Sequence, residues 1–398
     1  MWYFWPSKVI YGEDALDFIE NIAGKKCFIV TDEVLEELGY VDILREKLDS
    51  FGREYEIYTG VNPDPHEEDV LEAREKCIEY EPDLIFALGG GSVMDVAKAV
   101  LALYVYPDFG IDDLHPFNPD LYNMGKKCEL IAIPTTSGTG ADNTYAIIIS
   151  KKEEGMWKKL IHAHKGLVPS YSILDPVFPK GMPPKLTANT GFDALAHSME
   201  NFSNTWRNEF SNALGLKAIE LIFEYLPKAY EDGDDMEARD MMHQAATLAG
   251  IAFGNSSVHI GHSLGHSWGT IFKIPHGECV GVLTPYVIQF LINNPDDDKV
   301  QKIYAKMAKK LGWANWDDSD EDAIASIVEK IKELQETLGF PKKFADTEVS
   351  EDEMEENLDK LVELFYQDPT CTMAPRSPSG EQIKKLYRYA YKGKDVDF

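Results

Sequence analysis

Apolar residues in the first part of the chain form short runs that alternate with amphipathic stretches. Four runs of four or five residues, at 27–31, 55–58, 84–88 and 130–133, have the composition of strands, and the run at 27–31 that of a buried strand. Between them, residues 33–48, residues 65–79 and a stretch ending near residue 103 carry apolar positions with helical spacing. Strands that alternate with helices predict a mostly parallel sheet with helices on both faces.

The pattern changes after Met182-Pro183-Pro184. Residues 186–203, 209–230 and 236–253 show 3.6-residue periodicity with few β-branched runs, which predicts helices. Two consecutive prolines interrupt both helices and strand ladders. We therefore predict an α/β domain over residues 1–180 and an all-α domain over residues 181–398. The acidic run at 317–322 is interpreted as a solvated loop and a helix start, although a further boundary there is possible.

Charge and cysteine content narrow the classes of protein that fit. The chain of 398 residues has 68 acidic and 39 basic side chains, a net charge of -29, which disfavours binding to nucleic acids or anionic membranes. Its five cysteines never form a CxxC pair, as expected of reduced packing residues. No apolar run approaches the roughly 20 residues that span a bilayer. We expect a cytoplasmic protein without nucleic-acid or membrane partners.

A set of histidines and one aspartate predicts a divalent-metal site. Asp193 and His197 stand four residues apart, which places both on one face of a helix. His262 and His276 follow in a second histidine-rich stretch. Three imidazoles and one carboxylate suit Fe(II) or Zn(II), whereas Mg²⁺ or Ca²⁺ would require more oxygen ligands.

The residues alone do not decide which histidines of the second stretch bind the metal. His259, His262 and His266 are three and four residues apart and therefore lie near one helical face. If both His262 and His266 approach the metal, one of them could instead carry protons, because imidazole titrates in the suitable range.

Two loops at strand ends predict a nucleotide site. Gly89-Gly90-Gly91-Ser92 follows the strand at 84–88 and opens a helix. Backbone without side chains can approach a diphosphate, and the free N–H groups of a helix start favour anions. The sequence is not the GxGxxG pattern of a standard dinucleotide fold. The second loop, residues 134–140, supplies hydroxyls and glycines at the end of the next strand, so both loops indicate a crevice at the sheet's carboxyl edge.

Asp32 ends the first of these strands. Its carboxylate could accept hydrogen bonds from a ribose diol and repel a 2′-phosphate. It could equally cap the following helix, and the sequence does not separate the two roles.

Taken together, several segments resemble the iron-containing (group III) alcohol dehydrogenase family over nearly the whole chain. The segments are residues 89–98, 133–140, 174–176, 186–200, 262–269, 275–277 and 371–376. The resemblance implies an α/β N-terminal nucleotide-binding domain and an all-α C-terminal metal-binding domain, the dehydroquinate synthase-like architecture. It also implies a homodimer or larger homo-oligomer that acts on a small alcohol or aldehyde.

The resemblance also assigns residues by their motif positions. It implies Asp193, His197, His262 and His276 as metal ligands and His266 as the proton-handling histidine near nicotinamide and substrate. At Asp32 it implies a preference for NAD over NADP. The positions implied to contact the dinucleotide are Gly89, Gly90, Gly91, Ser92, Asp95, Thr135, Thr136 and Thr139.

We therefore expect reversible hydride transfer between NAD(H), or NADP(H), and a small primary alcohol or aldehyde. Fe(II), or Zn(II), would act as a Lewis acid on the alkoxide. A Zn-dependent, glycerol-type polyol dehydrogenase and a hydroxyacid–oxoacid transhydrogenase are the alternatives. Two segments depart from common family patterns, Ala141–Thr144 where Ser-Glu-Val-Thr is frequent, and His262–His266 where His-Ala-Met-Ala-His is frequent. These departures leave the substrate open.

Overall fold

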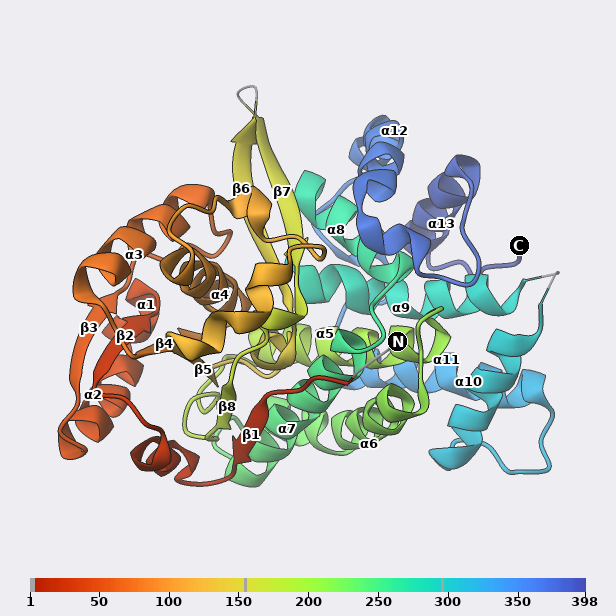
Figure 1. The fold of residues 1–398 in the computed structure, drawn as a ribbon. Helices are drawn as coiled ribbons and strands as arrows, with labels where there is room; N and C mark the ends of the chain where they lie inside the picture. The colour runs from red at the N-terminus through yellow and green to blue at the C-terminus, as the bar shows by residue number, and fades with distance from the viewer. Residues whose placement is uncertain (1–3, 154–155, 295–296) are drawn as a thin grey trace. The chain divides into compact units, whose positions relative to one another are not determined.

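The computed structural model describes residues 4–153, 156–294 and 297–398 (Figure 1). Its internal contacts divide the chain into two units, Met1–Met182 and Pro183–Phe398. The domain boundary expected from the sequence lies two residues earlier.

The first unit is built on a six-stranded parallel sheet with the order β1-β8-β5-β4-β2-β3. The strands are β1 (Lys8–Tyr11), β2 (Lys26–Val30), β3 (Glu54–Tyr58), β4 (Leu84–Gly89), β5 (Glu129–Pro134) and β8 (Tyr171–Leu174). The four strands expected from the sequence are β2 to β5, each within one residue at either end. The sequence interpretation missed β1, β8 and an antiparallel hairpin of β6 (Ala146–Glu153) and β7 (Met156–Ala163).

Alternating side chains of the sheet enter two separate hydrophobic cores, so helices cover both faces. Phe28 and Ile85 pack with α3 (Glu67–Tyr80) and α4 (Gly91–Val105), whereas Ile29 and Phe86 pack with α2 (Tyr40–Ser50). The expectation of a single helix over residues 33–48 is wrong. The chain forms α1 (Glu33–Glu37) and then α2, because Gly39 takes a left-handed conformation with φ of 81° between them.

The second unit is helical throughout its described residues and has a core of its own. Its helices are α5 (Pro184–Ser203), α6 (Glu209–Glu231), α7 (Met236–Gly254), α8 (Ile260–Phe272), α9 (His276–Ile292), α10 (Lys299–Lys310), α11 (Asp320–Thr337), α12 (Glu351–Gln367) and α13 (Gly380–Lys392). Short 3-10 helices complete both units, at Ala15–Asn21, Ile111–Asp113, Pro119–Lys126, Ala141–Asn143, Lys165–Leu167, Phe344–Asp346 and Pro369–Thr372. The acidic run ends in a helix start, as expected, with Ser319 as the N-cap of α11.

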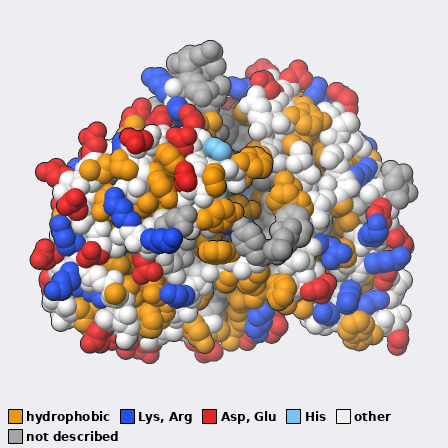
Figure 2. Space-filling view, in the orientation of Figure 1, with side chains coloured by type: hydrophobic (Ala, Val, Ile, Leu, Met, Phe, Trp, Pro, Cys, Tyr) orange, Lys and Arg blue, Asp and Glu red, His pale blue; other side chains and the backbone are white. Residues whose placement is uncertain are grey.

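Surface and core chemistry agree with the charge pattern of the sequence. The five cysteines are buried and free. Figure 2 shows acidic side chains spread over the visible face, with Lys and Arg interspersed among them. Within the described ranges, we find no helix with the length and apolar character needed to cross a membrane.

Candidate active site

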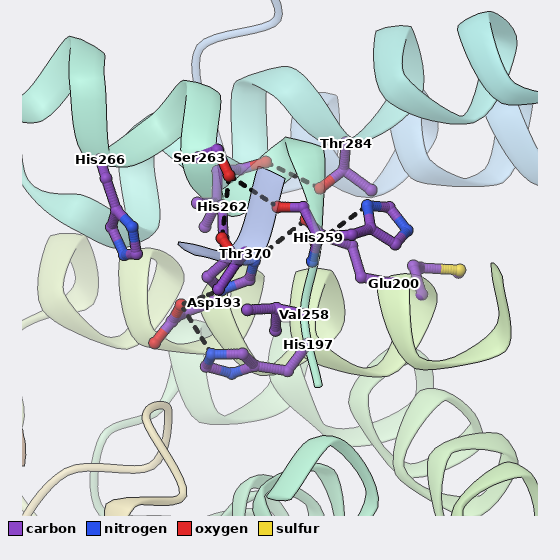
Figure 3. Close-up of polar contacts among 12 residues, drawn as sticks. Asp193, His197, Glu200, Val258, His259, His262, Ser263, His266, Thr284 and Thr370 are labelled. Carbon is purple, nitrogen blue, oxygen red and sulfur yellow. Dashed lines mark hydrogen bonds and ion pairs between the residues drawn. The ribbon is translucent and has the colours of Figure 1, made fainter. Parts of the chain in front are cut away.

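Helix α5 carries the first two candidate ligands on one face (Figure 3). Asp193 and His197 are both buried, and the His197 Nε2 lies 3.7 Å from the Asp193 Oδ1. The ring of His197 stacks on Phe253 at a centroid distance of 4.1 Å. This packing fixes the imidazole beside the carboxylate that stands one helical turn earlier.

Helices α8 and α9 bring two more imidazoles to the same carboxylate oxygen. The His262 Nε2 lies 4.0 Å and the His276 Nε2 3.3 Å from the Asp193 Oδ1. Asp193, His262 and His276 offer donor atoms that all lie within 4.8 Å of one another. His197 contacts the same oxygen but is not a member of that mutually close group.

These separations fit a divalent metal. Ligands about 2.1 Å from a tetrahedral Zn²⁺ or a similar ion are roughly 3.4 Å apart, close to the 3.3 to 4.0 Å seen around the Asp193 Oδ1. Among the described residues, neither the buried Asp193 Oδ1 nor the buried His262 Nε2 has a hydrogen-bond partner. Buried polar atoms normally have one, so a cation would satisfy both.

Burial and neighbouring charges keep these side chains in the protonation states that bind a metal. Burial lowers the pKa of His197 to about 3, against the opposing charge of Asp193, and holds the pKa of His262 well below its ordinary value. Both imidazoles are therefore neutral near pH 7, with a lone pair available. Burial alone would raise the pKa of Asp193, but His197 and His276 hold it well below its usual range.

A second buried carboxylate, Glu200, lies behind His262. The Glu200 Oε1 is 3.0 Å from the His262 Nδ1, and the Oε2 accepts a hydrogen bond from the backbone N–H of His259. The His259 Nε2 bonds the Ser203 hydroxyl at 2.7 Å. His259, one of the histidines that the sequence left open, is thus engaged within the protein. Burial raises the pKa of Glu200, and His259 opposes that effect.

His266 lies next to this group and is paired with a carboxylate from a distant segment. Its ring stacks on His276 at 4.9 Å, and its Nδ1 is 2.6 Å from the Asp368 Oδ2. The other oxygen of Asp368 accepts hydrogen bonds from the backbone N–H and the hydroxyl of Thr370, at 2.8 and 2.6 Å. These bonds, above all that of His266, lower the pKa of Asp368 to about 2 against the effect of burial. Because Nδ1 is engaged, Nε2 is the nitrogen available for proton exchange.

The two segments that depart from the family pattern are anchored inside their own units. Ser263, in the histidine segment, bonds the Thr370 hydroxyl at 2.8 Å and so connects to the Asp368–His266 pair. In the other segment, Asp142 accepts a hydrogen bond from the Ser172 hydroxyl of β8 at 2.6 Å.

Sequence reasoning missed Glu200 and Asp368 as site residues. Glu200 follows Asp193 and His197 at a spacing that keeps all three on one face of α5, so helical periodicity could have found it. Asp368 is 102 residues from His266 and carries no pattern that connects the two.

In the first unit, the two predicted loops meet because β4 and β5 are paired in register. Gly89 of β4 is opposite Pro134 of β5. A side chain at Gly89 would meet Val93 at 2.5 Å, and one at Gly91 would meet Thr139 at 3.1 Å, whereas Gly90 has only Thr136 nearby at 3.5 Å. Close packing therefore accounts for Gly89 and tightly restricts Gly91, and the backbone at Gly90 faces the Thr136 side chain.

The polar residues near these loops already have protein partners. The Ser92 hydroxyl donates to the Pro63 carbonyl at 2.8 Å, and Asp95 accepts from the backbone N–H of Ile148 at 3.0 Å. Buried Thr135 donates its backbone N–H to Gly89. Asp32 caps α1 by accepting the Leu35 N–H at 2.9 Å, so the capping role is present. One oxygen of Asp32 is used in this cap.

Comparisons with known proteins place this architecture in an enzyme class. The iron-containing alcohol dehydrogenase family model matches residues 6–176, and the model for the C-terminal part of the Fe-containing alcohol dehydrogenase family matches residues 187–391. The NADPH-dependent butanol dehydrogenase of Clostridium saccharobutylicum is 36% identical over 99% of this chain and 98% of its own length. An alcohol dehydrogenase of Thermococcus barophilus is 35% identical over 97% of this chain and 98% of its own.

Comparison with solved structures gives the same family. The iron-containing alcohol dehydrogenase of Thermococcus thioreducens superposes with a TM-score of 0.86 at 30% identity, covering 99% of this chain and 100% of its own. The protein is an oxidoreductase enzyme with an α/β N-terminal unit and a helical C-terminal unit. It belongs to the iron-containing alcohol dehydrogenase family, as the sequence motifs indicated.

Proposed function

We propose that the protein interconverts small primary alcohols and aldehydes with NAD(H), at an Fe(II) centre held by Asp193, His197, His262 and His276. The observation that carries this proposal is the convergence of three imidazole nitrogens on one buried carboxylate oxygen, at 3.3 to 4.0 Å. Three neutral imidazoles and one carboxylate also accept Zn(II), so the metal is part of the proposal. The named relatives favour alcohol oxidation and reduction over the polyol and transhydrogenase alternatives.

The residues have distinct parts in this chemistry. A divalent metal, when bound, supplies Lewis acidity that lowers the pKa of the alcohol hydroxyl. Asp193 contributes the negative charge of the ligand set, and burial keeps His197 and His262 neutral. His266 exchanges the alcohol proton through Nε2, because Asp368 holds its Nδ1.

We propose the paired loops of the first unit as the nucleotide site. The start of α4 offers backbone N–H groups without a side-chain cap, beside Thr136 and Thr139. Thr135, Ser92 and Asp95 support these loops from inside the unit. The second oxygen of Asp32 would accept a ribose hydroxyl and disfavour a 2′-phosphate. The butanol dehydrogenase relative is named as NADPH-dependent, so the preference of this chain needs a direct test.

The test combines metal analysis with a nicotinamide absorbance assay. Protein purified without oxygen should contain about one metal per chain, and Fe(II) should support NADH-linked turnover of primary alcohols and aldehydes. His262→Ala should abolish both metal binding and turnover. Full activity in a metal-free His262→Ala protein would overturn the proposal. Faster turnover of polyols with Zn(II), or reduction of oxoacids without added NADH, would favour one of the alternatives instead.

The proposal also covers the cellular location and the oligomeric state of the enzyme. We propose a cytoplasmic enzyme that assembles as a homodimer or larger homo-oligomer. Light scattering coupled to size exclusion measures the oligomer mass, and a monomer at micromolar concentration would contradict this part.

A further inference from the structure

We propose that Glu200 is a positioning residue that holds His262 in its metal-binding orientation and thereby strengthens metal binding. The inference rests on the proposed metal centre and adds a residue that does not itself touch the metal. Figure 3 shows Glu200 and Asp193 on α5, with His262 placed between them on α8.

The two ring nitrogens of His262 face different carboxylates. Nδ1 is 3.0 Å from the Glu200 Oε1, and Nε2 is 4.0 Å from the Asp193 Oδ1. An ionised carboxylate can only accept hydrogen bonds, so the proton of the neutral imidazole belongs on Nδ1. The lone pair is then on Nε2, on the side where the candidate ligands converge. Glu200 therefore selects the tautomer of His262 that can bind a metal.

The carboxylate is itself fixed at both oxygens. The Oε2 accepts the backbone N–H of His259, which precedes the first residue of α8, and lies 3.1 Å from the His259 Nδ1. Behind His259, the Ser203 hydroxyl bonds the His259 Nε2 at 2.7 Å and the Tyr304 hydroxyl at 2.9 Å. Glu200, His259, Ser203 and Tyr304 are all buried. The carboxylate cannot move without breaking this network.

Gly261 provides the space that Glu200 occupies. A Cβ atom at position 261 would lie 2.1 Å from the Glu200 Oε1 and 3.1 Å from its carboxyl carbon. Real Cβ atoms essentially never make contacts below 3.0 Å, so any side chain at 261 would displace the carboxylate. The glycine before His262 thus allows α8 to approach α5 closely enough for the Glu200–His262 hydrogen bond.

A purely structural role for Glu200 makes a different prediction. If the carboxylate served only to accept the His259 N–H at the start of α8, its loss would lower stability and leave metal affinity unchanged. If it positions His262, substitution by glutamine weakens metal binding in the folded protein. The glutamine amide can present its NH₂ group to the His262 Nδ1, which moves the imidazole proton to Nε2 and removes the lone pair from the metal side.

The experiment measures metal affinity directly, with Co(II) as the probe. Metal-free full-length protein is titrated against a chromophoric chelator, and the visible absorption of bound Co(II) reports its coordination. We expect Glu200→Gln to weaken Co(II) binding about 10- to 100-fold, the usual effect of removing such a partner of a ligand histidine. Gly261→Ala, which displaces the same carboxylate without changing charge, should weaken binding in the same direction.

Ser203→Ala is the matched control. It removes a buried hydroxyl that bonds the His259 Nε2, the Tyr304 hydroxyl and the backbone carbonyl of Glu200. The two bonds of the Glu200 carboxylate, to the His262 Nδ1 and the His259 N–H, stay in place, so Ser203→Ala should lower the melting temperature and leave the Co(II) affinity within about twofold. Wild-type affinity in folded Glu200→Gln would overturn the inference, and so would an equal loss in Ser203→Ala. If Glu200→Gln does not fold, Gly261→Ala decides by the same criterion. A wild-type protein without stoichiometric Co(II) binding would instead overturn the proposed metal centre itself.

Discussion

Gly277 controls how closely the start of α9 approaches α5, and its substitution by alanine should disable the metal centre. A Cβ atom at position 277 would lie 2.1 Å from the Asn189 carbonyl oxygen, 2.7 Å from its carbonyl carbon and 3.3 Å from the Asp193 Cβ. The obstructing atoms at Asn189 belong to the backbone of α5, so no side chain can rotate away.

The displacement follows from these distances. A comfortable contact needs about 3.5 Å, so relief of the 2.1 Å contact requires the two helices to separate by roughly 1.4 Å. His276, next to Gly277, would move away from Asp193 with α9. Metal–ligand distances tolerate only about 0.2 Å, so this shift removes His276 from the ligand set. We expect Gly277→Ala to cost about 1–3 kcal/mol in stability and to reduce bound metal and turnover severely.

The assay pairs this variant with an overpacked glycine of the sheet unit. A Cβ atom at Gly166 would collide with the backbone carbonyl of Leu121, as the one at Gly277 collides with that of Asn189, and the sheet unit holds none of the proposed ligands, so Gly166→Ala is the matched control. Urea unfolding should show destabilisation of both Gly277→Ala and Gly166→Ala, and elemental analysis should show metal loss only in Gly277→Ala. Wild-type metal content in folded Gly277→Ala, or equal metal loss in both variants, would refute the reasoning.

Three further changes test other parts of the site. Asp368→Asn should lower kcat at least about tenfold without changing the metal content, because it releases the Nδ1 of His266. Steady-state kinetics gives kcat and elemental analysis gives the metal content, and an unchanged kcat would contradict the prediction. Lys98→Met should cost about 3–5 kcal/mol because it removes a fully buried ammonium group and leaves the partly buried Asp95, 3.8 Å away, without a cation. In urea unfolding, its combination with Asp95→Asn should cost less than the sum of the two single changes, and additive effects would contradict the pairing. His197 has its ordinary pKa of 6.5 in the unfolded chain and a pKa of about 3 in the folded chain. Between these two pH values only the unfolded chain binds the proton, so acidification from pH 6.5 towards pH 3 destabilises the metal-free protein. This residue should contribute a loss of about 2 kcal/mol between pH 7 and pH 5 in urea unfolding, and His197→Asn should remove that part of the pH dependence.

Strong periodicity explains which elements the sequence revealed. Strands β2, β4 and β5 are buried apolar runs, and β3 is an edge strand that alternates charged with apolar residues. The predicted ends of all four are correct within one residue. β1 and β8 have only four residues each, and β6 changes from apolar residues to the charged Lys151-Lys152-Glu153, so neither length nor alternation identified them. The break at Gly39 interrupts a stretch whose apolar spacing continues across it.

In the candidate site, too, the sequence predicted what depends on local spacing and not what depends on tertiary packing. The spacing of Asp193 and His197 predicts a shared helical face, and the structure places both there. Which later histidines meet them depends on the packing of α8 and α9 on α5, which local spacing does not encode. The resemblance to known dehydrogenases supplied that choice. Asp368 reaches His266 only through tertiary folding, so a single sequence without relatives gave no sign of the pair.

The four proposed ligands all belong to the helical unit, and among the described residues its hydrophobic core contains none from the sheet unit. A bound ion stabilises only the part of the chain that folds around it, by about 2.7 kcal/mol when its concentration is a hundred times its dissociation constant. Metal bound at the proposed centre should therefore protect the helical unit against heat and proteolysis, and nucleotide bound at the proposed loops should protect the sheet unit. Limited proteolysis of metal-free protein should then begin in the helical unit and leave the sheet unit intact.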